Sequence, residues 1–107
     1  MNTYFKTLTA LLLALIVYGT AYAQNSYEAA MGTALQSLSQ AKQPNDFATL
    51  ANRFEQISNT VTDQWTPLYY AAYCQLVAGI SQQQPANKDS YFDKALQLVA
   101  NADTRAS

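Results

Sequence analysis

The side chains that most often carry out catalysis are scarce in this sequence. It contains no His and one Cys, Cys74, among 107 residues, which excludes His-based triads, His-ligated metals and a disulfide within the chain. Asp89 and Asp93 lie one helical turn apart and could share a proton or hold a metal, but Lys88 and Lys94 flank them, as on a solvated helix face. We therefore expect no enzymatic activity, no metal and no cofactor.

Aromatic side chains are concentrated in one short segment instead. Trp65, Tyr69 and Tyr73 are spaced four residues apart, so a helix places them on one face, with Tyr70 rotated off that face. Tyr and Trp suit interfaces because one end of the side chain is apolar and the other is polar. Two interpretations stay open at this point: these four residues form a face that binds a protein or peptide, or they fill the hydrophobic core.

The N-terminal 23 residues have the layout of an export signal. A positive start that includes Lys6 is followed by the apolar run Leu8–Val17 and by the small-residue site Ala21-Tyr22-Ala23. The apolar run is shorter than the roughly 20 residues that a membrane-spanning helix needs. We expect cleavage after Ala23, a mature chain of residues 24–107 without a membrane span, and a location in the periplasm or outside the cell.

Charge argues against nucleic acid as a partner. The chain carries 6 Lys and Arg against 7 Asp and Glu, a net charge of −1, and loss of Lys6 with the signal leaves it at −2. A phosphate backbone is held by a basic excess, which is absent here. Half of the residues are apolar and 12% are charged, so the composition is that of a folded chain.

The apolar residues of the mature chain recur with the 3.6-residue period of helices, and no alternating strand pattern is found. The spacing predicts four helices that form two antiparallel hairpins, over about 25–60 and 65–103. Asn25, Asn45, Thr66 and Asn87 are the expected N-caps, with Asp46 in the first turn of the second helix. Gly79 is expected just after the third helix, and Gly32 where a neighbouring helix approaches closely.

The third helix, over residues 68–78, is apolar almost all round. A helix of this kind is a buried one, so we expect it at the centre of the domain, with Cys74 as a buried thiol. Residues 81–87 read as a polar loop, and residues 103–107 as a frayed end.

The sequence Tyr91-Phe92-Asp93-Lys94-Ala95-Leu96-Gln97-Leu98 resembles the second-helix signature of the tetratricopeptide repeat family. The resemblance implies a short α-solenoid in which Phe92, Ala95 and Leu96 pack within the repeat. Ala71 and Ala72 stand where that family has small residues in its first helix, and Trp65 is the aromatic near its start. The terminal proline of the repeat is missing after Val99.

The resemblance also implies a function, because the first helices of these repeats line a face that binds peptides. We expect an exported, non-enzymatic module that binds or scaffolds other proteins, with Trp65, Tyr69, Tyr70 and Tyr73 as the binding face. The alternative is a small structural or dimerising helical bundle without a groove. Two repeats are few for a stable stack, and the fourth helix has apolar residues on two sides, so we also expect either self-association through that helix or a continuation of the chain.

Overall fold

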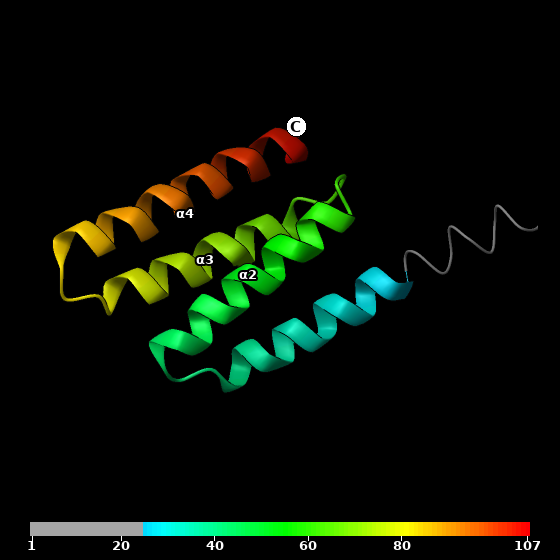
Figure 1. Ribbon diagram of the computed structural model, residues 1–107. Coiled ribbons are helices and arrows are strands. Elements are labelled where there is room, and N and C mark those ends of the chain that lie inside the picture. The colour runs from blue at the N-terminus through cyan, green and yellow to red at the C-terminus, as the bar shows by residue number, and fades with distance from the viewer. Residues whose placement is uncertain (1–24) are drawn as a thin grey trace, which may run out of the picture.

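The computed structural model describes residues 25–107, and this part of the chain is entirely helical apart from its connections (Figure 1). Residues 25–40 are helical and are followed by α2 (Pro44–Thr60), α3 (Thr66–Ile80) and α4 (Pro85–Ala106). Each helix lies antiparallel to the next in Figure 1, as short connections require. The expected all-α fold of four helices in two hairpins is therefore confirmed. The export signal expected over residues 1–23 lies outside the described residues.

Prolines, more than asparagines, set where the helices begin. α2 starts at Pro44 and α4 at Pro85, after the extended residues Gln43 and Gln84. Proline suits the first helical position because its fixed φ is already helical and an N–H there would lack a partner in any case. Asn45 and Asn87, expected as N-caps, lie within the first turns, and the connection between α3 and α4 is shorter than expected.

The other two starts also differ from the expected ones. Asn25 is already helical, and Trp65 caps α3 one residue before Thr66, with Pro67 as the second helical residue. Asp46 takes up its expected place in the first turn of α2. Its carboxylate accepts the backbone N–H groups of Gln43 at 3.0 Å and Lys42 at 3.1 Å, which lowers the pKa of Asp46.

α3 lies between α2 and α4 and packs against both, so it is the central element of the described residues (Figure 1). Its buried side consists mostly of small residues, which let the helix axes come close: Pro67, Leu68, Ala71, Ala72, Cys74, Gln75, Ala78 and Gly79. The expectation of a helix buried all round holds for this side alone, because Trp65, Tyr69 and Tyr73 are exposed.

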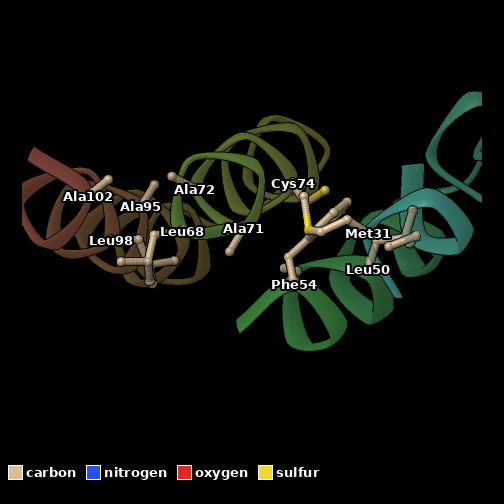
Figure 2. Packing of buried hydrophobic residues seen from close by; sticks show 12 residues of the cluster. Met31, Leu50, Phe54, Leu68, Ala71, Ala72, Cys74, Ala95, Leu98 and Ala102 are labelled. Atoms are coloured by element: carbon tan, nitrogen blue, oxygen red, sulfur yellow. The ribbon is translucent and has the colours of Figure 1, made fainter. Parts of the chain in front are cut away.

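Larger side chains fill the core from the neighbouring helices. Figure 2 shows Leu98 of α4 beside Leu68 of α3, and Phe54 of α2 near Cys74. Met31 and Ala34 bring the helix of residues 25–40 into the same core. Burial raises the pKa of Tyr27, although a hydrogen bond with the Thr66 side chain lowers it in part.

The two glycines within helices have opposite surroundings. A Cβ on Gly79 would lie 2.8 Å from Cβ of Tyr91 and 2.9 Å from Cε1 of Phe92, whereas a Cβ on Gly32 would have nothing within 4 Å. From the sequence, the close approach was expected at Gly32 and the end of the third helix just before Gly79. Gly79 instead lies in the last turn of α3, which ends at Ile80, and its missing side chain lets α4 pack directly on the helix backbone.

The same substitution should therefore have opposite effects at these two sites. Gly32→Ala is expected to stabilise the fold by up to about 1 kcal/mol, because alanine has the higher helix propensity. Gly79→Ala is expected to destabilise it by about 1–3 kcal/mol, because the added Cβ overpacks the contact with α4. Urea unfolding followed by circular dichroism measures both changes, and equal signs would contradict this account.

The C-terminal residues are ordered by one side chain that reaches across the fold. Nη1 of Arg105 donates hydrogen bonds to the carbonyl oxygens of Ser58 at 3.2 Å and Gln64 at 3.0 Å. The Ser58 carbonyl belongs to the last turn of α2, where carbonyls lack helical partners. α4 accordingly continues to Ala106, where a frayed end was expected, and its last turn is joined to α2 and to the connection between α2 and α3.

Replacement of Arg105 by Met keeps most of the side-chain volume but removes both hydrogen bonds. We expect Arg105→Met to lower the free energy of unfolding by about 1–3 kcal/mol and to speed amide exchange in the last turn of α4. Hydrogen exchange with mass spectrometry measures the second effect. Lys42→Met, which removes an exposed charge, serves as the control and should change neither quantity measurably.

Candidate functional site: the outer face of α3

The aromatic residues singled out in the sequence lie together on the outer side of α3. Trp65, Tyr69 and Tyr73 are 44%, 54% and 46% exposed, in spite of their size. They do not fill the core, which was the alternative interpretation of this cluster. Tyr70, rotated off their face, is half-buried.

The exposed row is longer than the sequence analysis proposed. Leu76 and Ile80 follow Tyr73 at spacings of three and four residues and are also exposed, Ile80 to 68%. We name these five residues the α3 face: Trp65, Tyr69, Tyr73, Leu76 and Ile80. Their spacing places Leu76 and Ile80 on the same face as Tyr73. The sequence did not reveal that they are exposed, because a helix that is apolar all round has no polar side to indicate which face meets solvent.

Ring contacts hold the aromatic end of this face in place. Tyr69 meets Trp65 and Tyr70 edge to face, with ring centroids 6.2 Å and 5.7 Å apart. Tyr70 in turn stacks on the buried Phe54, at 5.4 Å between centroids. The rings are thus connected to the core, so a partner that binds them meets a surface already partly ordered, and less entropy is lost on binding.

The chemistry of the α3 face is apolar contact and hydrogen bonding. α3 contains no Asp, Glu, Lys or Arg, so the face offers aromatic and aliphatic surface together with two tyrosine hydroxyls. Interfaces are enriched in such residues, since tyrosine buries a large area while its hydroxyl keeps a hydrogen-bond partner. A partner with its own apolar side chains would fit this face.

Of the five residues expected to pack within the repeat, three are buried, one is half-buried and one is exposed. Ala71, Ala72 and Ala95 are buried, and Phe92 is half-buried with its ring edge beside Gly79. Leu96 differs, because it is 69% exposed on the outer side of α4. Leu98, two residues further along, takes the inward position. α4 is therefore rotated about its own axis relative to the orientation expected from the sequence.

Residues 25–107 contain no group of three or more Cys, Asp and Glu side chains that could hold a metal. No helix of this part of the chain is long and apolar enough to cross a membrane. Cys74 is fully buried, and burial raises the pKa of its thiol to about 11, so the thiolate that would react is strongly disfavoured.

Alkylation of Cys74 should therefore require unfolding. At pH 8 we expect iodoacetamide to modify the folded protein at least about 100-fold more slowly than the protein in urea, because the thiol is both protonated and shielded. Mass spectrometry over time measures this ratio. Equal rates in the folded and unfolded states would show that the thiol is accessible and free to pair between chains.

Comparisons with known proteins give no assignment. No protein-family model matches the chain, and neither the curated proteins nor the solved structures searched contain a significant match.

Proposed function

We propose that this chain is an exported, non-enzymatic helical-repeat module, similar to tetratricopeptide repeats, that binds a protein or peptide through the α3 face. The observation that carries the proposal is the exposure of five large apolar residues in one row on a central helix. A helix packed on both sides would be expected to hide such residues. Export is proposed from the signal-like sequence of residues 1–23.

The size of the exposed surface supports a binding role. Each side chain of the α3 face is roughly half exposed, which leaves on the order of 100 Å² apiece and about 500 Å² in total. The largest apolar patch of a typical monomer is about 300–600 Å² and is often functional. The α3 face is thus large for a domain of this length, and its charge-free surface carries little desolvation penalty on binding.

The similarity of the two hairpins supports the repeat character. Pro44 and Pro85 begin the second helix of each hairpin at the same position of the helix, 41 residues apart. Small residues on α3, together with Gly79, provide the close helix crossings that the repeat family uses. In such repeats the first helix of each unit lines the binding face, and α3 is the first helix of the second hairpin.

A peptide selection tests the proposal directly. Protein expressed from the full 107-residue sequence would be panned against a displayed library of random 12-residue peptides, and binders measured by calorimetry. We expect apolar, aromatic-containing peptides that lose at least about 10-fold in affinity with Tyr69→Ala and again with Tyr73→Ala, since central aromatic contacts each contribute more than about 1.4 kcal/mol.

Two controls separate binding from folding. Leu96→Ala removes an apolar side chain of α4 that is more exposed than either tyrosine and lies outside the α3 face, so it should leave the affinity for these short peptides unchanged. Both Tyr variants should melt within a few degrees of the wild type. If no peptide is selected, or if selected peptides bind the double variant Tyr69→Ala, Tyr73→Ala as well as the wild type, the proposal fails.

A further inference from the structure

A second apolar surface lies on α4 next to the residues that it buries, with the Phe92 ring against Gly79 of α3 at its inner edge. Leu96 and Val99 are 69% and 39% exposed, and Phe92, four residues before Leu96, is half-buried. The spacings of four and three place these residues on one strip of the helix. We name Phe92, Leu96 and Val99 the α4 ridge.

The α4 ridge can be compared with the corresponding residues of α2, the second helix of the first hairpin. Pro44 and Pro85 set a register of 41 residues between α2 and α4. The α2 positions that correspond to Phe92 and Val99 are Ala51 and Ser58, and both are completely buried. The position that corresponds to Leu96 is Glu55, which pairs with Lys94 of the next hairpin at 2.8 Å. The corresponding strip is thus buried at two of its three positions on α2, whereas Leu96 and Val99 stay exposed on α4.

A groove lies at the opposite edge of the fold, between the helix of residues 25–40 and α2. Its volume is about 800 Å³. One wall consists of Tyr27 and of short side chains of the first helix, among them Ala29, Ala30 and Thr33, and the other wall includes Ile57 and Val61. In Figure 1 the helix of residues 25–40 and α4 lie at opposite ends of the row of helices.

The charge of the groove lining is opposite in sign to the carboxylates near the ridge, although Asp63 lies close enough to the groove residue Tyr27 to add to the rise in its pKa that burial causes. Arg53 is the charged residue of the groove lining. Asp89 and Asp103 lie seven residues before and after Leu96, two turns away on the same side of α4, and both are exposed.

Hydrogen bonds and an ion pair direct the positive charges of α4 elsewhere. Lys94 binds Glu55, and Arg105 binds the carbonyls of Ser58 and Gln64, so both cations are turned toward α2 and its following connection. Lys88 is half-buried in the first turns of α4. The strip that carries the ridge is therefore apolar with acidic ends, and it matches an apolar groove that contains an arginine.

We propose that the α4 ridge of one copy of this chain docks into the groove of a second copy, so that hairpins continue head to tail from one molecule to the next. The two surfaces differ and lie at opposite ends, which makes the contact heterologous and open-ended. Residues 1–24 are the other segment of this chain that could reach the groove, but they carry Lys6 and no acid. They lack the charge that would complement Arg53.

Light scattering during size-exclusion chromatography tests the proposal with protein expressed from the full sequence. The wild type should show an average mass that rises with concentration, beyond that of a dimer. Leu96→Glu, which alters the ridge, and Ala29→Glu, which fills the groove, should each be monomeric by itself. An equal mixture should form a dimer and nothing larger, because each pair of molecules then retains one intact ridge and one intact groove.

Charge reversal gives an independent measurement that a folding defect would not reproduce. Arg53→Glu should weaken association at least about 10-fold, and the combination of Arg53→Glu with Asp89→Arg and Asp103→Arg should restore it. Tyr73→Ala on the α3 face should have no effect on association between copies. Self-association and peptide binding are thus tested by different variants, and either proposal can fail without the other.

Two results would overturn the head-to-tail contact. One is a wild type that stays monomeric at about 1 mM, where a contact with a Kd of about 1 mM would be plainly populated; a groove filled by residues 1–24 or reserved for another protein would give this result. The other is an Ala29→Glu variant that associates as the wild type does, because the contact would then join two copies of the same surface.

Discussion

The close approach of α3 to its neighbours is the constraint on which the rest of this structure depends. Ala71, Ala72, Ala78 and Gly79 bring the helices together on the inner side of α3, and at Gly79 no room remains even for a methyl group. Large side chains at these four positions would separate the helices. The Trp, Tyr, Leu and Ile residues of the α3 face therefore lie on the outer side, and the site we propose is a consequence of how the core packs.

The polar contacts between the two hairpins both stabilise the fold and determine which charges remain at its exposed edge. Lys94 and Arg105 join α4 to α2 and its following connection. Arg105 supplies donors to carbonyls at the end of α2, where backbone acceptors lack helical partners. These two cations are thus turned toward α2, Lys88 is half-buried, and the exposed strip around Leu96 has the carboxylates of Asp89 and Asp103 near its ends. The contacts that stabilise the fold thus also set the charge of its open edge.

The described residues present two apolar surfaces, the α3 face and the α4 ridge. Cys74 is buried with a raised pKa, and residues 25–107 contain no cluster of potential metal ligands. The α3 face and the α4 ridge are separate in residues and in charge, so one can serve a partner while the other joins copies of the chain. A head-to-tail stack would set α3 faces side by side and increase avidity for an extended partner.

The sequence by itself determined the helical fold, the number of helices and the central place of α3, because period and hydrophobicity are local properties. It also determined that Trp65, Tyr69 and Tyr73 share a face, which follows from their spacing alone. Only the tertiary structure decided which side of α3 is solvated, which way α4 is rotated, and which glycine marks the close contact. An apolar helix has no polar side to mark its orientation, and Arg105 finds its acceptors more than 40 residues away in the chain. These features depend on packing between helices that are distant in the sequence, and a local sequence pattern contains no information about that packing.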